Sequence, residues 1–570
     1  MRHQIIATVL LAGVSALAYG QNLNPTVEVT NAYEGGAGSI VKPLQKMAVP
    51  DSVTAFNLDF DYSVFEKPYQ GAYEFKPYHV QLRPRPLLST ENSFYLKAGA
   101  GYTLHPELDL VWTPLRKERG QVDIYATHRS YLGNYHKIAP ADQMEEDGGR
   151  PFRATGDRMP GYLTDTRVGA DGSYSWEGGM ASLDVAYRNW LAEDDFLFRR
   201  LNGVEAKARV RSLPSDAPHF LYDAAVDYHF YDLDGSWATS LVPSRSADFS
   251  ESRFDLDGTF GPVFGPDRRL LVDLDMSLVR YSDYFTGYTG GLSVTPKYEF
   301  ALDDWRFSLG ARVSTIIYSE DWGGNKVKSQ LVYPAVHVDF RLLDDQLILQ
   351  AAATGGDRIN ARSEAFFVRP FALSAEYDHS MERVRAMLGA RGNIASRFRF
   401  DLQAGYALLN RVPLDGFAID SGIYLPVLAE ALDAERNKAF NLVFAELDYG
   451  WKSESVTVDG RMAYRWTDMS GEGLFAPAAF TGSIRPAWHW GDRFSAGLDA
   501  AWSTRRDAYY RNQYLPVPGW VDLGAFVEFR FTHHLGLWIK GGNLLNQAVQ
   551  RTPLHAEAGM YGTAGILLNF

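Results

Sequence analysis

Residues 456–467 read VTVDGRMAYRWT, and their side chains alternate in character along the chain. A β-strand turns successive side chains to opposite faces, so this stretch would have one apolar face and one polar face. It therefore predicts a strand with one side suited to lipid and the other to a wet lumen. The apolar row is Val456, Val458, Gly460, Met462, Tyr464 and Trp466, and the opposite row is Thr457, Asp459, Arg461, Ala463, Arg465 and Thr467.

The same alternation recurs elsewhere in the chain. It is found in residues 204–211, 271–278 and 521–532, and Phe526 alone interrupts the polar row of the last stretch. A soluble sandwich also alternates, but it does not explain the length of these stretches or the aromatic residues near their ends, which suit the interfacial girdles of a membrane barrel. The sequence predicts an all-β fold, a transmembrane antiparallel β-barrel.

Composition supports a barrel. The chain contains 51 Gly, 32 Tyr, 33 Phe and 13 Trp among 570 residues, yet its mean hydropathy is only -0.23. A membrane strand needs only alternate side chains to face lipid, so the mean hydropathy stays low. The net charge of -13 argues against nucleic acid, because binding to phosphates needs a basic surface. We expect outer-membrane lipid to surround the barrel.

The N-terminus predicts export. Arg2 and His3 precede an apolar run from Ile5 to Leu17, and Ala18-Tyr19-Gly20 supplies the small residues of a cleavage site. We expect residues 1–20 to be a signal peptide, removed before Gln21, and the protein to reach the cell outer membrane. The sequence has no cysteine, so it can form neither a disulfide nor a thiolate metal site.

Short polar turns give the number of strands. We find ten, and with both chain ends in the periplasm they predict 22 strands, within a range of 16 to 22, joined by short periplasmic turns and longer extracellular loops. We expect irregular loops at 132–161 and 355–377 and a short helix in a loop at 425–436. The barrel would occupy residues 91–570. The ten turns lie near Lys117, Gly178, Pro214, Pro266, Asp303, Asp344, Ser396, Ser453, Asp492 and His533.

The last strand carries a pattern of its own. Thr563, Gly565, Leu568 and Phe570 resemble the β-signal that the barrel-assembly machinery reads during biogenesis, so that machinery is an expected partner. The closing strand must also pair with the first, which would give it a lipid-side row. That row would be Met560, Gly562, Ala564, Ile566, Leu568 and Phe570.

Several motifs resemble one family. Gly542-Asn543-Leu544-Leu545-Asn546, followed by a strand ending at Phe570, is similar to the end of TonB-dependent receptor barrels. Residues 95–102 with 127–130 are similar to the opening strands of a plug-poor set of such proteins, and residues 369–371 with 389–392 fit the middle of that set. The resemblance implies a receptor-type barrel that acts as a channel or receptor for transport across the outer membrane. The alternative is a non-transporting barrel subunit of an assembly, secretion or surface complex.

The N-terminal segment, residues 21–90, is too short for a full plug domain. Within it, Thr26, Val27, Glu28, Val29 and Thr30 resemble a TonB box, which would pair as an added strand with TonB or another envelope protein. Residues 68–86 combine Pro, Tyr and Arg and favour an extended path, either through the lumen or along the periplasmic rim.

No residue pattern indicates catalysis. His533-His534 lies in a predicted turn without further ligands, and His229, near Asp227, has no nucleophile motif beside it. We therefore expect no enzyme activity, no catalytic or metal residues and no cofactor. Charged rows such as Arg461 with Arg465, and Asp273 with Asp275, are expected to pair across strands of a polar lumen.

Overall fold

The structure is a computed structural model. It describes residues 93–570, apart from 214–218, 238–244, 247, 284–286, 319–331, 343–345, 375–378, 421, 431–438, 470 and 492. The predicted signal peptide (1–20), the TonB-box-like residues 26–30 and the proline-rich stretch 68–86 lie outside the described residues.

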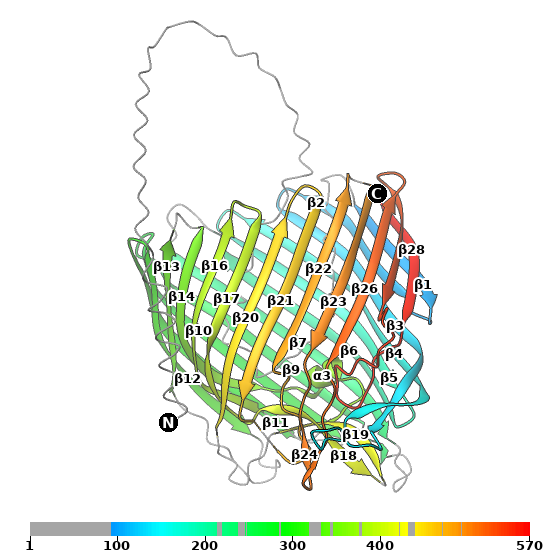
Figure 1. Ribbon diagram of the computed structural model, residues 1–570. Helices are drawn as coiled ribbons and strands as arrows, with labels where there is room; N and C mark the ends of the chain where they lie inside the picture. Colours follow the sequence, from blue (N-terminus) through cyan, green and yellow to red (C-terminus); the bar gives the residue numbers. More distant parts are fainter. Residues whose placement is uncertain are drawn as a thin grey trace, which may run out of the picture. The chain divides into compact units, whose positions relative to one another are not determined.

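Twenty-two antiparallel strands form one closed barrel (Figure 1). The ring closes where the first strand pairs with the last, with Gly99 opposite Gly565 and Tyr102 opposite Gly562. A two-residue strand, β8 (Arg245–Ser246), pairs with the last two residues of β7. The barrel strands are β1 (Phe94–Tyr102), β2 (Glu107–Lys117), β3 (Gly120–Pro140), β4 (Phe152–Trp176), β5 (Gly179–Glu193), β6 (Leu197–Ser212), β7 (Phe220–Trp237), β9 (Phe249–Pro262), β10 (Arg268–Asp283), β11 (Gly287–Leu302), β12 (Trp305–Tyr318), β13 (Val332–Leu342), β14 (Leu347–Ile359), β16 (His379–Ile394), β17 (Phe398–Asn410), β20 (Phe440–Lys452), β21 (Val456–Thr467), β22 (Phe480–Trp490), β23 (Phe494–Ser503), β26 (Trp520–Arg530), β27 (Leu535–Gly542) and β28 (Tyr561–Asn569).

The predicted strand count is confirmed. Each of the ten predicted turns falls at or between the ends of two paired strands, as at Lys117 between β2 and β3 and at Ser453 between β20 and β21. The two faces also follow the prediction. Tyr464 and Trp466 are exposed on the outer face, and Arg461 lies on the inner face, 3.1 Å from Glu446 and 3.5 Å from Asp448.

Two loop predictions were wrong. Residues 132–161 are mostly strand, because β3 and β4 continue as a paired hairpin as far as Pro140 and Phe152. Residues 425–430 belong to a strand rather than a helix, because β19 (Ile423–Glu430) pairs with β18 (Pro413–Asp420) and with β15 (Leu373–Ser374). Residues 431–436 of that predicted helix lie outside the described residues.

The predicted irregular segment 355–377 contains regular structure. Strand β14 continues through it to Ile359, and a short helix, α3 (Arg362–Val368), follows. Among the described residues, no helix is long and apolar enough to cross a membrane.

The wall of the barrel is uneven in height. Strands β3 and β4 have 21 and 25 residues, whereas β27, β28 and β1 have 8, 9 and 9. In Figure 1, β28 and β1 end well before the far end of β3 and β4, which lies near α3, β18 and β19. The long strands therefore form a tall arm at the extracellular end, beside a low rim at the closing seam.

Candidate functional site

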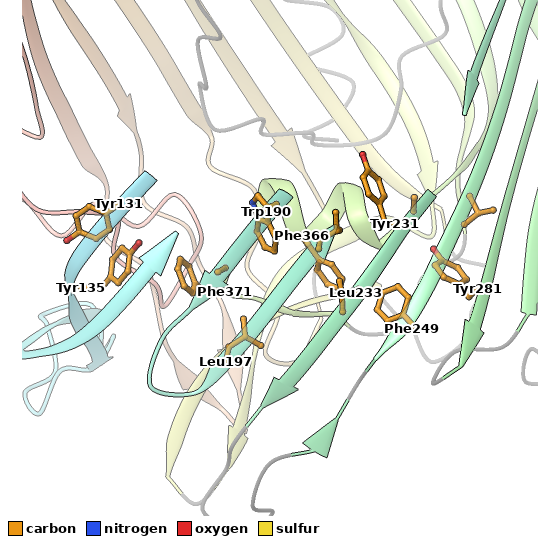
Figure 2. Close-up of a cluster of buried hydrophobic side chains, with 14 of the residues drawn as sticks. Tyr131, Tyr135, Trp190, Leu197, Tyr231, Leu233, Phe249, Tyr281, Phe366 and Phe371 are labelled. Carbon is orange, nitrogen blue, oxygen red and sulfur yellow. The ribbon is translucent and has the colours of Figure 1, made fainter. Parts of the chain in front are cut away.

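The candidate site is the extracellular end of the barrel, where the connection from β14 to β16 folds inward. Ala361, Phe366 and Phe371 of this segment, with Ile359 at the end of β14, join a buried apolar cluster with residues from the inner wall (Figure 2). We call the segment 360–372, which includes α3, the inner loop. The wall residues of the cluster are Tyr131, Tyr135, Met159, Trp190, Ala192, Leu197, Leu201, Tyr231, Leu233, Phe249, Val279 and Tyr281.

A buried carboxylate anchors the start of α3. Glu251, on β9, is 1% exposed, and its Oε2 accepts the backbone N–H groups of Arg362 and Ser363 at 3.0 and 3.1 Å. The Ser363 hydroxyl donates to the other oxygen. First-turn N–H groups have no partner within a helix, so Glu251 supplies acceptors that the chain before α3 does not. His229, on β7, also lies here, with Nε2 3.4 Å from Glu251 Oε1.

A second, half-buried carboxylate holds the helix on both sides. Glu364, within α3, accepts from Arg253 Nη1 on the wall at 2.6 Å and from Arg358 Nη2 at the end of β14 at 2.9 Å. Its two oxygens thus connect α3 to the wall and to the preceding strand. Charge-assisted bonds of this kind are stronger than neutral ones.

Arginines of the wall cover the aromatic residues of the inner loop. The Arg199 guanidinium lies 3.7 Å from the centre of the Phe366 ring, and the Arg188 guanidinium lies 3.6 Å from that of Phe367. Arg199 also donates to the carbonyl oxygens of Pro370 at 2.9 Å and Ala372 at 3.2 Å. The inner loop is therefore held by ionic, polar and apolar contacts together.

Five other extracellular connections form a second apolar layer. Phe152 packs edge-on against Phe417 and Phe475, with ring centres 5.6 and 5.9 Å apart. These rings come from the connections that follow β3, β17 and β21. The full cluster is Phe152, Phe417, Phe475, Ala508, Leu515, Val517 and Leu554. We call it the loop core.

An ion triad joins the inner loop to this layer. Asp415, on β18, accepts from Arg369 of the inner loop and from Arg506 Nη2, at 2.7 Å in the second case. Burial alone would raise the pKa of Asp415, but the two guanidinium groups lower it below its usual value. Three connections far apart in sequence therefore meet at one ionised carboxylate.

A histidine and an aspartate lie together at the other side of the inner loop. The His555 ring stacks on Phe371 with centres 3.9 Å apart, and its Nε2 is 3.8 Å from Asp194 Oδ2. Burial lowers the pKa of His555 to about 3. Burial also raises the pKa of Asp194 to about 6, although the N–H groups of Phe196 and Leu197 donate to it and oppose that shift.

The predicted C-terminal signal lies on the closing strand, away from this site. Thr563 is 1% exposed, whereas the Phe570 ring is 53% exposed and stacks on His534 at 5.3 Å. A Cβ on Gly565 would lie 2.0 Å from the carbonyl oxygen of Ala98, so glycine lets the two strands of the seam pair. Reading of these residues by the assembly machinery remains a prediction.

His533 and His534, which were weighed as possible metal ligands, lie in the β26–β27 turn, where His534 Nδ1 is 2.8 Å from the carbonyl oxygen of Asn569. Within the described part of the chain, no group of three or more His, Asp or Glu side chains is placed to hold a metal ion. Glu251, Arg199 and Asp415 carry no local signal in the sequence, because their partners lie far away along the chain.

Comparison with known proteins adds the fold relationship. No protein-family model and no curated protein matches the sequence. Among solved structures, the copper transporter OprC is similar with a TM-score of 0.59 and 12% identity, over 84% of this chain and 80% of that chain. The barrel has the fold of the TonB-dependent receptors.

Two further structures agree with this receptor fold. The FrpB iron transporter from Neisseria meningitidis aligns with a TM-score of 0.60 and 9% identity, over 84% of this chain and 81% of that chain. The siderophore receptor PirA from Acinetobacter baumannii gives 0.55 and 11%, over 84% and 80%. At these identities the likeness is one of fold. It confirms the predicted receptor-type barrel.

Proposed function

We propose that this protein is a receptor-like transporter of the outer membrane, in which the inner loop is the extracellular gate. The observation that carries the proposal is the docking of α3 onto the barrel wall through Glu251, where a polar anchor lies next to an apolar cluster. The receptor fold, and the transporters and receptors that share it, support a transport role.

The contacts of the inner loop suit a gate that opens as one piece. Its ionic and polar contacts are made to wall residues such as Glu251, Arg253 and Arg199, rather than only within the segment. Displacing the loop would replace these contacts with water while leaving the wall strands paired. A bistable packed element of this kind is the usual basis of gating.

We extend the proposal to energy coupling. In it, Thr26–Thr30 engages TonB or another envelope protein as an added strand, and the rest of residues 21–90 transmits that contact to the barrel. The support is the sequence pattern and the receptor fold. Replacing Val27 and Val29 with proline should abolish pull-down of the TonB C-terminal domain, since proline cannot donate the hydrogen bonds of an added strand. Unchanged pull-down would refute this assignment.

Planar-bilayer conductance tests the gate. Three variants are compared with the full chain: one with residues 361–371 replaced by a short Gly-Ser linker, one without residues 21–90, and one with both changes. We expect the linker to raise single-channel conductance, most of all when residues 21–90 are also absent. Heat-modifiable gel migration checks that each barrel is folded. A folded double variant that conducts no more than the full chain would contradict the proposal.

A second function is favoured by the loop core. Phe152, Phe475 and Leu515 are fully buried between connections, so the extracellular layer is itself a folded surface that could bind a partner without opening. The protein would then be a non-transporting subunit of an outer-membrane complex. Purification from native membranes in mild detergent distinguishes the two. A stoichiometric partner together with a silent double variant supports the subunit, and a protein that purifies alone argues against it.

A further inference from the structure

The closing seam is short compared with a membrane. Strands β28 and β1 have nine residues each, and nine residues rising about 3.4 Å each at a tilt of about 40° span about 23 Å. The apolar band around such barrels is about 25 Å tall. These strands therefore use their whole length within the bilayer, and the chain just beyond their extracellular ends lies at the height of the outer leaflet.

Several apolar side chains are exposed at this height, beside the polar Asn546, whose Oδ1 accepts the N–H of Met560 at 3.1 Å. Tyr102 is 80% exposed, Leu104 57%, Met560 52% and Leu545 48%, and none of these side chains is charged. Leu132 and Leu544, at 45% and 39%, belong to the same surface. We call these six residues the seam patch.

The seam patch is continuous across neighbouring strands. Tyr102 is paired with Gly562 of β28, two residues from Met560, and Leu104 forms a bridge to Leu132 of β3. The Leu544 side chain folds back over β27, so that its Cδ2 lies 3.0 Å from where a Cβ of Gly541 would be. The patch thus continues the outward row of β28 beyond the ends of the strands.

We infer that the seam patch is inserted in the outer leaflet, with lipid acyl chains as its occupant. Leu104 and Leu544–Leu545 would then be membrane-embedded although they belong to the connections after β1 and β27. Two observations favour lipid: the patch extends the lipid-facing row of β28, and the short strands leave it within the bilayer. Exposed apolar side chains gain free energy by leaving water. The tall arm of β3 and β4 would stand in water beside this point.

Site-directed spin labelling tests the inference, and the absence of native cysteine makes each introduced cysteine unique. Nitroxides are placed by L104C and L545C in the full chain, reconstituted in vesicles of di-oleoyl phosphatidylcholine. The lipid control is I566C, on the outer face of β28, and the water control is A154C, exposed on the tall arm. Collision rates with oxygen and with a water-soluble nickel chelate are measured at each site.

We expect the labels at 104 and 545 to collide often with oxygen and rarely with the nickel chelate, as the label at 566 does. In bilayers with 14-carbon chains, the nickel accessibility at 104 and 545 should rise several-fold, while 566 stays protected. Labels that resemble position 154 in both bilayers would overturn the inference. Labels that are shielded from both reagents in native membrane vesicles, but open to oxygen in pure lipid, would show that a protein partner covers the seam patch. That result would also overturn the inference.

Discussion

The Arg506 guanidinium donates a hydrogen bond of 2.7 Å to the carboxylate of Asp415, which also accepts from Arg369. The Asp415 side chain is only 7% exposed. The two arginines come from connections 137 residues apart in the sequence, since Arg369 lies in the inner loop and Arg506 follows β23. The inner loop is thereby joined to the extracellular layer at Asp415, in addition to the stacking of Phe371 on His555 and the packing of Ala365 against Leu428.

Asp415→Asn should loosen both the inner loop and the loop core. Removing one partner of a buried ion pair typically costs about 3 to 5 kcal/mol, because the remaining charges lose compensation. We expect faster hydrogen exchange in both 362–372 and 505–517, together with more frequent channel openings. Asp499→Asn, which breaks a pair with Arg485 on the luminal wall, is the matched control and should change neither. Faster exchange in only one of the two segments would contradict the coupling.

Glu251→Ala should release α3 without unfolding the barrel. The substitution removes the acceptor of the Ser363 N–H and leaves the Arg362 N–H with only the Tyr281 hydroxyl, 3.1 Å away, and a buried unsatisfied group costs about 1 to 3 kcal/mol. The population of the displaced loop should rise roughly 5- to 30-fold for about 1 to 2 kcal/mol. Limited proteolysis at 362–372 measures this. Glu299→Ala, on the luminal wall of β11, is the control, and equal cleavage in the two variants would reject a specific anchor.

The pair of His555 and Asp194 predicts opposite pH responses in two variants. His555 has its pKa lowered to about 3, so its contribution to loop stability is present above about 6.5 and is lost as pH falls toward 3. Asp194 has its pKa raised to about 6, so its neutral form favours the closed loop at low pH, and that contribution is lost as pH rises from about 4 to 6.

In Asp194→Asn, the connection around His555 should therefore open more often as pH falls below about 6.5. In His555→Phe, the same connection should open more often as pH rises from about 4 to 6. In the unsubstituted protein, the effects of His555 and Asp194 on stability oppose each other between pH values of about 4 and 6. Hydrogen exchange of 554–558, corrected for the intrinsic rate at each pH, measures the response. Parallel pH profiles for the two variants would show that these groups do not control the loop.

Gly565→Ala should block closure of the barrel. The new Cβ would meet the Ala98 carbonyl oxygen at 2.0 Å, whereas at Gly562, on the same strand, the nearest atom is 3.9 Å away. Refolding into lipid vesicles without assembly machinery should lose most of the heat-modifiable band for Gly565→Ala and retain it for Gly562→Ala. A normal yield for Gly565→Ala in this system, with failure only in cells, would instead indicate reading of the C-terminal signal.

The sequence predicted the parts of the barrel that face lipid. Alternation and polar turns are local, so the ten turns and the strand number followed from them. The tall arm was missed because the pattern inverts there. Tyr131, Tyr135 and Met159 point inward and are buried against the inner loop, whereas Arg158 points outward into water. The prediction assumed a polar inner face, so a strand with an apolar inner face did not fit the expected alternation and was predicted as irregular loop.

The docking of the inner loop onto the wall could not be predicted for a different reason. Glu251 and Ser363 are separated by 112 positions and meet only because β9 and the inner loop occupy the same part of the barrel. Pro426 and the surrounding Leu and Ala residues suggested a helix, but pairing with β18 makes this stretch the strand β19. In both cases tertiary contacts determine the structure, and they leave no periodic signal in the sequence.

Along strand β4, the face that tolerates a charged side chain consequently changes from one side of the strand to the other. At Val168, 45% exposed on the lipid face, an outward charge should be costly, whereas ten residues earlier Arg158 already occupies the same face in water. On the inward face the rule reverses, from the charged Arg167 to the buried Met159. A mutational scan of this single strand should therefore change sign partway along it, and the position of that change would mark the water boundary of the membrane on this side of the barrel.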